Sequence, residues 1–263
     1  MSTIFKIMRY VLMDVLRNRW VIGYALFFLA ITDVLLRLGG SGPRALLSLL
    51  NVVVLLIPLV SIVFGTIYWH GAREFNELLL SQPVARTTLF HGLFAGLVIP
   101  LSVAFVVGVS IPVLVHRATD VDTLPLLTLM LLAGCALTAV FSALAVLIAG
   151  LVDDRLKGLG IALAVWLLMT VAYDGLVLWV AMVFQDYPLE GPMLALSFAN
   201  PVDLARVLLV LRFDVSALMG YTGAVMQRIM GSPLGMAAAF GGLALWTLAP
   251  GLLALRAFKR RDF

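Results

Sequence analysis

The chain has 263 residues, of which 63% are hydrophobic and only 12% are charged, and its net charge is +4. Soluble domains carry about 25% charged residues, so the composition excludes an ordinary water-soluble domain and indicates an integral membrane protein. The small positive charge matters through its distribution on the two sides of the membrane. We expect lipid as the main surrounding and no nucleic-acid partner.

Residues 3–19 form the first predicted element, an amphipathic helix. Phe5 and Leu12 share one face, whereas Lys6 and Arg9 share the other. A helix of this kind lies in the plane of the lipid headgroups, with its basic face toward anionic lipid. We expect no cleavable signal peptide, because the first long apolar run starts late and lacks a small-residue cleavage site.

Six apolar runs are long enough to cross a bilayer, which needs about 20 apolar residues. They cover about 20–38, 46–69, 92–115, 124–151, 158–184 and 233–257, within a single membrane domain spanning 1–263. Asp33 and Arg37 lie at i and i+4 near the end of the first run, and we expect them to form an ion pair within that helix. Cys135 lies inside the fourth run and, as the single cysteine, cannot form an intrachain disulfide.

The basic residues predict the orientation of these spans. Placing both termini in the cytoplasm leaves only six of the 18 Lys and Arg residues outside: Arg37, Arg44, Arg117, Arg206, Arg212 and Arg228. Three of the six fall in one long loop, where charge has little influence on orientation. The opposite orientation would put the larger set outside, so we expect both termini in the cytoplasm.

A polar segment, 70–91, separates the second run from the third. Arg73, Asn76, Glu77 and Leu80 fall on one side of a predicted short helix, and Arg73 can pair with Glu77 at i, i+4. Pro83 ends the helix, because the residue before a proline is driven out of the helical region. On physical grounds alone the segment is either an ordinary interfacial loop helix or a docking surface on the membrane face.

The connection 185–232 is far longer than the other loops on its side. Asn200 has the features of a helix N-cap, Pro201 suits the first helical position, and Asp203 lies in the first turn. This helix should end near Arg212, after which Asp214 can cap a second helix that runs to residue 226. We therefore expect two short helices at the outer leaflet. Their charged residues would lie near the aqueous rim, where they can dock a partner: Asp203, Arg206, Arg212 and Asp214.

Few residues have the placement of a reactive site. No G-x-x-x-x-G-K-[ST] phosphate loop occurs, so ATP would have to be bound by a separate subunit. Asp174 lies deep in the fifth run, and an intramembrane carboxylate is a functional candidate by default. It either bonds between helices or opens to a wet substrate cleft. Tyr173-Asp174 also resembles one half of an intramembrane aspartyl protease site, but the second carboxylate that this chemistry requires is missing.

No metal site is expected. His70, His91 and His116 are predicted to lie in loops or at interfaces, and they lack the spacing of metal ligands. Four methionines cluster weakly in the outer part of the chain: Met219, Met226, Met230 and Met236. Thioethers suit Cu(I), although an apolar, Met-rich interfacial helix is the commoner explanation.

The polar segment carries a resemblance to a known family. Arg73-Glu74, the leucines at 78–80 and the pattern Ser81-x-Pro83-x-x-Arg86 resemble the first cytoplasmic loop of ABC-2-type transporter permeases. The C-terminal Phe-x-Arg-Arg-Asp-Phe at 258–263 resembles the ending of many members. The resemblance covers the whole chain and implies an all-α integral membrane protein like type V exporters. Such a fold has six transmembrane helices, an N-terminal interfacial helix, and a short outer re-entrant helix pair between helices five and six.

The resemblance also implies partners. The loop helix would be the coupling helix that sits on a cytoplasmic ATPase subunit, with these residues in contact: Arg73, Glu74, Asn76, Glu77 and Leu80. ATP and Mg would be bound by that ATPase, so this chain would hold no cofactor and no catalytic residue. One chain supplies half of the usual membrane domain, which implies a homodimer in a bacterial inner membrane. Small residues of the fifth run, Gly158, Ala162 and Ala164, would allow close approach of helices.

A narrower resemblance lies in the long outer loop. Asn200-Pro201-Val202-Asp203 and the stretch 213–225 are similar to permeases that serve maturation of the copper sites of nitrous oxide reductase in denitrifying bacteria. This similarity implies a periplasmic β-helical subunit as a third partner.

Other functions remain open from the sequence. An ABC-2 exporter could instead move a lipid, a polysaccharide or a drug. A secondary transporter would use Asp174 and would be expected to have paired broken spans in two matching halves, which this sequence lacks. A purely structural membrane anchor would need no coupling loop. Co-purification of an ATPase separates these alternatives.

The predicted orientation can be measured with single cysteines at positions 2 and 232 in a Cys135→Ala background. An impermeant maleimide added to intact cells should label Ser232→Cys and leave Ser2→Cys unlabelled, because the membrane shields the cytoplasmic side. Equal labelling of the two positions would contradict this topology.

Overall fold

The computed structural model describes residues 12–15, 18–39, 42–72, 85–118, 120–121, 123–184, 190–212 and 232–260, and every regular element among them is helical. In chain order these are α2 (Arg19–Leu38), α3 (Gly42–Gly71), α5 (Arg86–Val115), α6 (Thr123–Leu151), α7 (Arg155–Leu167), the π-helical turn η1 (Leu168–Ala172), α8 (Tyr173–Val183), α9 (Glu190–Ala199), α10 (Pro201–Arg212) and α12 (Pro233–Arg260).

Six stretches are long and apolar enough to cross a membrane, which confirms the six predicted spans: α2, α3, α5, α6, α12 and the combined stretch α7–η1–α8. Several helices are longer than the apolar runs that predicted them. The second span begins at Gly42 rather than near residue 46, and the third begins at Arg86 rather than near residue 92. Apolar residues mark only the hydrocarbon part of a helix, whereas the backbone hydrogen bonds continue into the polar layer.

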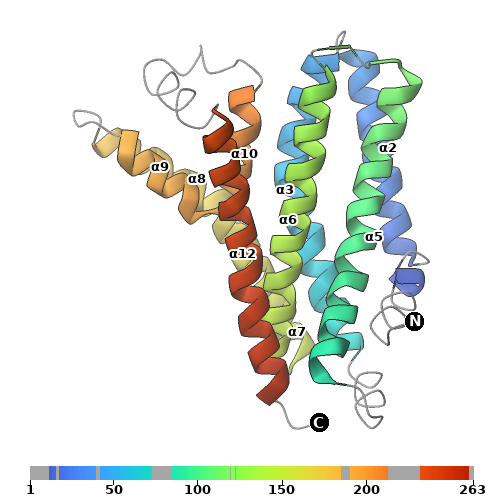
Figure 1. The fold of residues 1–263 in the computed structure, drawn as a ribbon, viewed down its shortest axis with the longest axis vertical. Coiled ribbons are helices and arrows are strands. Elements are labelled where there is room, and N and C mark those ends of the chain that lie inside the picture. The colour runs from blue at the N-terminus through green and yellow to red at the C-terminus, as the bar shows by residue number, and fades with distance from the viewer. Residues whose placement is uncertain are drawn as a thin grey trace.

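Helices α3 and α6 form the centre of the bundle, with α2 and α5 on one side and α10 and α12 on the other (Figure 1). Phe28 of α2, Phe105 of α5 and Phe141 of α6 are fully buried. The rings of Phe28 and Phe105 meet edge to face, with centroids 5.0 Å apart. The Phe105 ring also lies where a Cβ on Gly134 would be, so this glycine lets α5 approach the backbone of α6. Such close packing is what holds helices together in lipid.

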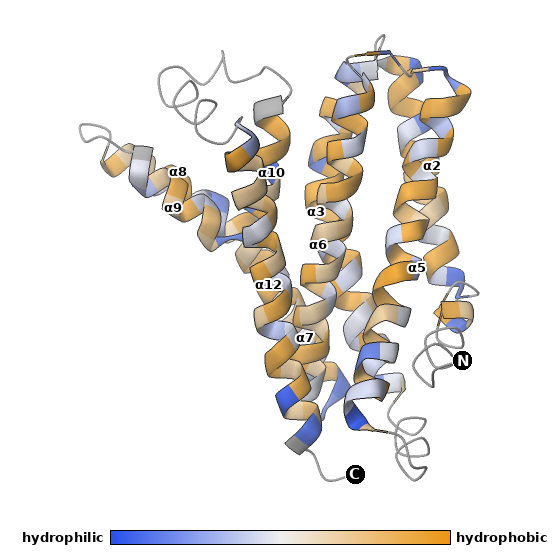
Figure 2. Cartoon of the chain, in the orientation of Figure 1, coloured by the Kyte–Doolittle hydropathy of each residue, from blue (hydrophilic) through white to orange (hydrophobic). Residues whose placement is uncertain are grey.

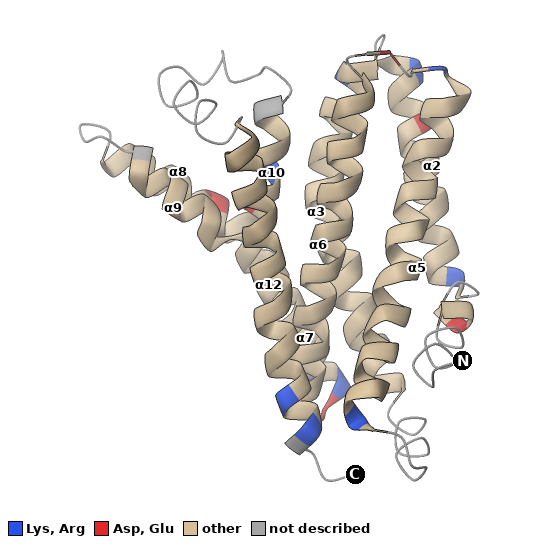
Figure 3. Ribbon diagram, viewed as in Figure 1, with Lys and Arg blue, Asp and Glu red and all other residues tan. Residues whose placement is uncertain are grey.

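Both ends of the bundle are polar, and the helix sections between them are mainly apolar (Figure 2). We call the end formed by Gly71, Arg86, Leu151 and Arg155 the basal end, and the opposite end the distal end. Charged residues gather at the two ends, except for those at the start of α2 and a small group where α8, α9 and α10 meet (Figure 3). This distribution is that of helices whose middle sections face lipid, because a charge in hydrocarbon is costly.

Aromatic side chains and one arginine close the basal end. Phe258 of α12 is buried against Trp69 of α3 and Phe90 of α5, with ring centroids 6.0 and 5.9 Å away. Arg86 donates a hydrogen bond from Nη1 to the carbonyl oxygen of Lys259, over 2.7 Å. The first residue of α5 therefore binds one of the last carbonyl groups of α12, which would otherwise lack a partner within the helix.

The segment between the fifth and sixth spans differs in detail from its prediction. The helix expected to end near Arg212 is present as α10, but α9 precedes it and was not predicted. α8 and α9 lean away from the bundle, whereas α10 packs against α6 and α12 (Figure 1). The second predicted helix, beginning at Asp214, lies outside the described residues.

Three further predictions fall mainly outside the described part of the chain. The interfacial helix 3–19 is described only at 12–15, which are helical, and at 18–19. The loop helix with Arg73, Glu74, Asn76, Glu77 and Leu80 falls in 73–84, outside the described ranges. Three of the clustered methionines, Met219, Met226 and Met230, also fall outside them.

Candidate functional site

The fifth span is not a continuous α-helix. Between α7 and α8 the backbone forms the π-helical turn η1, whose residues include Thr170. The Thr170 hydroxyl donates a hydrogen bond to the carbonyl oxygen of Trp166, over 2.7 Å. A π turn adds one residue to the helix, and one residue corresponds to about 100° of rotation, so it redirects the side chains that follow. The next turn carries Asp174.

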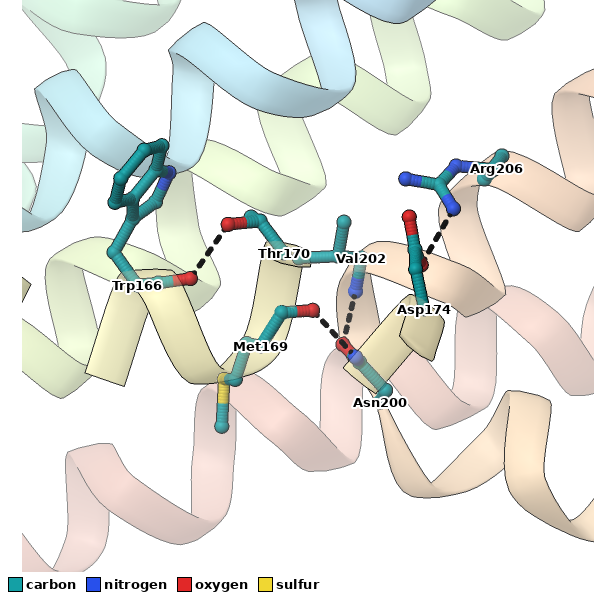
Figure 4. Close-up of polar contacts among 7 residues, drawn as sticks. All are labelled: Trp166, Met169, Thr170, Asp174, Asn200, Val202 and Arg206. Atoms are coloured by element: carbon teal, nitrogen blue, oxygen red, sulfur yellow. Dashed lines mark hydrogen bonds and ion pairs between the residues drawn. The ribbon is translucent and has the colours of Figure 1, made fainter. Parts of the chain in front are cut away.

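Asp174 is held by an arginine from α10. Nη1 of Arg206 lies 2.7 Å from Oδ1 of Asp174, and the two side chains are 30% and 37% exposed, respectively. Figure 4 shows the two groups facing each other across the gap between α8 and α10. An intramembrane carboxylate requires such a partner, so the prediction that Asp174 bonds between helices is confirmed. Its use as a substrate group remains a hypothesis.

The ion pair borders a cavity of about 330 Å³. Its polar wall consists of Asn51, Thr170, Asp174 and Arg206, and its apolar wall of Val54, Leu55 and Val171. Asn51 is an exposed residue within α3. Amide, hydroxyl, carboxylate and guanidinium groups thus meet at one place along an otherwise apolar surface, and they offer both donors and acceptors.

Asn200 joins the broken span to the turn between α9 and α10. Its amide nitrogen donates to the carbonyl oxygen of Met169, over 2.6 Å, and its Oδ1 accepts from the backbone N–H of Val202, over 2.9 Å. The N-cap role predicted for Asn200 is confirmed, and the bond to Met169 is additional. Because Asn200 is only 1% exposed, these groups depend on one another for hydrogen bonds (Figure 4).

Two more side chains bind backbone oxygens at the end of α9. Tyr173 donates from its hydroxyl to the carbonyl oxygen of Leu196, over 2.6 Å. Trp246 of α12 donates from Nε1 to the carbonyl oxygen of Phe198, over 3.1 Å. The last carbonyls of α9 therefore have partners where water is scarce. The sequence could have indicated these roles, since Tyr and Trp within membrane helices usually find a partner for the polar group.

The four residues predicted at the outer rim lie in different surroundings. Arg206 is partly buried and bound to Asp174, not on a free rim. Asp203, in the first turn of α10, interacts with Ser197 and, electrostatically, with both Arg206 and Asp174. Arg212 ends α10, and Asp214 lies outside the described residues. Because α10 packs against α6 and α12, Asp203 and Arg206 lie among neighbouring helices, and their contact with a partner stays a prediction.

The positions of several other residues can be compared with their predictions. Asp33 forms the expected ion pair with Arg37, at 2.8 Å, and also binds Nε2 of His116 at 2.7 Å. His70, expected in a loop or at an interface, is instead a buried residue of α3. Gly158 and Ala162, expected to face a second copy, are buried inside the chain.

Within the described ranges, no group of three or more His, Cys, Asp or Glu residues could hold a metal ion. The groups that line the Asp174 site offer recognition by charge and hydrogen bonding, and they can pair with each other or with a polar ligand.

The comparison with known proteins identifies the class. Residues 7–263 match the family described as ABC-2 family transporter protein, so the chain belongs to this family. Its members are membrane-spanning permease subunits without catalytic activity, and the family implies an ABC ATPase as partner.

Two relatives point to a particular kind of permease. The chain is 27% identical over 281 residues to a probable ABC transporter permease protein NosY of Pseudomonas aeruginosa, and the match covers 99% of both chains. It is 29% identical over 280 residues to the probable NosY permease of Stutzerimonas stutzeri, again over 99% of each.

The Asp174–Arg206 pair makes a measurable prediction. Asp174→Ala and Arg206→Ala should each lower the melting temperature in detergent, because each leaves one partly buried charge without its partner. The double variant should lose less than the sum, giving a coupling energy of about 1 to 3 kcal/mol.

The matched control is the more exposed pair within α2. The same cycle on Asp33 and Arg37 should give about 0.3 to 0.5 kcal/mol, as is typical of intrahelical pairs. Strictly additive losses at Asp174 and Arg206 would show that the observed pair contributes nothing to the fold.

Proposed function

We propose that this chain couples a separate cytoplasmic ATPase to a periplasmic partner, as the permease of a transporter that serves assembly of the copper sites of nitrous oxide reductase. The observation that carries the proposal is the match of residues 7–263 to the ABC-2 family, together with full-length similarity to two NosY permeases. In this arrangement ATP and Mg bind to the ATPase, and this chain contributes no cofactor.

The ATPase would dock at the basal end. The segment 73–84 connects α3 to α5 there, and its proposed contact residues are Arg73, Glu74, Asn76, Glu77 and Leu80. Basic residues in the described ranges are also more numerous at this end (Figure 3). The basal end has Arg86, Arg155, Lys157, Arg256, Lys259 and Arg260, whereas the distal end has Arg37, Arg44, Arg117 and Arg212. Basic residues favour the cytoplasmic side, which supports an inner-membrane location with both termini cytoplasmic.

A second copy and a periplasmic β-helical subunit would complete the assembly. One chain provides six spans, and 1–263 would act as a single membrane domain that pairs with itself. The periplasmic subunit would dock at the distal end, near Arg212 and Asp214. Asp203 and Arg206 lie inside the α8–α9–α10 junction, so they would support that surface from within.

Asp174 would contribute to the path of the cargo. Together with Arg206, Asn51 and Thr170 it gives the cavity a polar wall beside a break in the span. If the ion pair opens during transport, the same groups can bind a polar part of the cargo or its water.

A second candidate function is export of a lipid. A groove of about 1350 Å³ runs between α2 and α3, walled mainly by apolar and aromatic side chains such as Phe27, Val60 and Phe64. Asp14, Arg19 and Arg155 line its basal part. An apolar groove with charges at one end suits an amphiphilic molecule. This feature distinguishes lipid export from polysaccharide or drug export and from a secondary transporter that uses Asp174.

The proposed function is tested by co-purifying the chain with its ATPase after charge reversal at either end. Glu77→Lys should reduce recovery of the ATPase about tenfold or more, because it would remove the predicted Arg73–Glu77 pair and place like charges on the proposed docking face. The matched control, Arg212→Glu, should leave ATPase recovery unchanged and slow capture of the periplasmic subunit, most strongly at low salt.

Normal ATP turnover by the complex carrying Glu77→Lys would reject segment 73–84 as the docking element. Loss of the ATPase with Arg212→Glu, rather than of the periplasmic subunit, would reject the assignment of the two ends.

A further inference from the structure

His70 is a buried side chain in the last turn of α3, three residues before the segment 73–84. Its Nδ1 lies 2.8 Å from the carbonyl oxygen of Thr66, in the preceding turn of the same helix. Its Nε2 lies 3.0 Å from the carbonyl oxygen of Val152, in the connection between α6 and α7. The ring therefore spans from the end of one helix to the start of another span.

The two acceptors define what the ring must donate. A carbonyl oxygen accepts hydrogen bonds and cannot donate one, so each ring nitrogen needs an N–H to bond as it is placed. A neutral imidazole has one N–H, whereas an imidazolium has two. Both bonds form together only in the cationic ring, and bonds from a charged donor are stronger than neutral ones.

The elements next to His70 carry charged residues of both signs, of which the carboxylates favour a cationic ring and the basic side chains oppose it. They are Asp153 and Asp154 in the connection, and Arg155 and Lys157 at the start of α7; α6 carries none. Asp154 interacts electrostatically with His70, and hydrogen bonds from the backbone N–H groups of Lys157 and Leu156 hold the pKa of its carboxyl below the usual value. Asp154 is thus an anion across the pH range in which imidazole titrates.

The ring of His70 is closely packed against the start of α7. A Cβ on Gly158, in the first turns of α7, would lie 2.8 Å from Cε1 of His70 and 3.3 Å from Nε2. The ring is fixed at both nitrogens, so it cannot move aside without losing a bond. Asp154 caps α7 at the same place by accepting from the N–H of Leu156, over 2.8 Å. The start of the fifth span is therefore held to the end of α3 through one side chain.

We propose that His70 is a positioning residue that transmits movement of the 73–84 segment to the fifth span, and so to the break at Asp174. This inference rests on the proposed function, because it takes 73–84 to be the place where the ATPase docks. A push on 73–84 displaces the last turn of α3. The His70 bond to Val152 then carries the connection and the first turn of α7 along, rather than letting α3 move alone.

The test has one readout that does not involve the ATPase. In the purified permease, hydrogen exchange at 152–158 should be faster in His70→Leu than in the wild type, because the bond to Val152 is lost. His70→Gln should remain close to the wild type, because its amide N–H can still reach that carbonyl. Exchange that is equally fast in His70→Gln and His70→Leu, or unchanged in both, would overturn the proposed link.

The second readout measures transmission in the permease–ATPase complex reconstituted in lipid nanodiscs. An environment-sensitive fluorophore on Leu156→Cys, in a Cys135→Ala background, reports on the start of α7, since Leu156 is 79% exposed. Addition of Mg-ATP should change its emission. The His70→Leu variant should bind the ATPase normally but show a change about tenfold smaller, consistent with loss of one hydrogen bond. Gly158→Ala should reduce it in the same direction, because the added methyl displaces the ring.

The conservative variant and a matched histidine separate a positioning role from a merely structural one. His70→Gln should keep most of the wild-type response, because its amide N–H can still donate to the carbonyl oxygen of Val152. His91 of α5 also bonds to a carbonyl four residues earlier, that of Thr87 at 2.7 Å, and His91→Leu should respond like the wild type.

A full fluorescence response in His70→Leu would overturn the inference. Failure of the wild-type chain to bind any ATPase would instead reject the proposed function, while the exchange measurement would still decide whether the link exists.

Discussion

A polar backbone group inside a bilayer must find its hydrogen-bond partner within the protein, because lipid offers none. This constraint is most demanding where the chain leaves regular helix between the fifth and sixth spans. There the backbone turns from α9 into α10 beside a π-helical interruption, and Asn200 supplies both a donor to Met169 and an acceptor for Val202. Tyr173 and Trp246 bind the carbonyls at the end of α9.

The polar contacts also determine where charge can be placed. Once α10 is held against α6 and η1, Arg206 reaches Asp174 across the junction, and the carboxylate gains a partner that its own helix does not provide. The result is a small polar cavity in an otherwise apolar bundle. At the basal end a different pair of contacts, Arg86 to Lys259 and His70 to Val152, joins the helices on either side of the 73–84 segment to the rest of the bundle. The two polar regions lie on one path, because α7 begins next to His70 and leads directly into η1.

The length of apolar runs was enough to predict the six spans, and local spacing was enough for the Asp33–Arg37 pair and for the Asn200 cap. These features depend on neighbours in sequence. The partner of Asp174 is 32 residues away, and the sequence offered Arg206 only as one charge among several in a loop. Burial of α10 against α6 decides that pairing, and helix burial of this kind has no local signal.

The π turn and the role of His70 were missed for related reasons. Nothing in the composition of residues 168–172 distinguishes a π turn from an α turn, since π turns occur as single turns inside otherwise regular α-helices. His70 lies next to a polar segment, and the composition of that segment suggested a loop. In the structure, however, α3 continues to Gly71. Gly158 and Ala162 were correctly read as sites of close approach, but the approach is to groups in the same chain.

The most direct test of whether Asn200 holds the broken fifth span in place uses substitutions that separate its two hydrogen bonds. Asn200→Asp can still accept from the N–H of Val202 but can no longer donate to Met169 as a carboxylate. If Asn200 holds the broken fifth span to α10, hydrogen exchange at 168–174 should become faster in Asn200→Asp, while the first turn of α10 remains protected. Asn200→Ala should expose both segments. Unchanged protection of 168–174 in Asn200→Asp would contradict the view that this side chain holds the break in place.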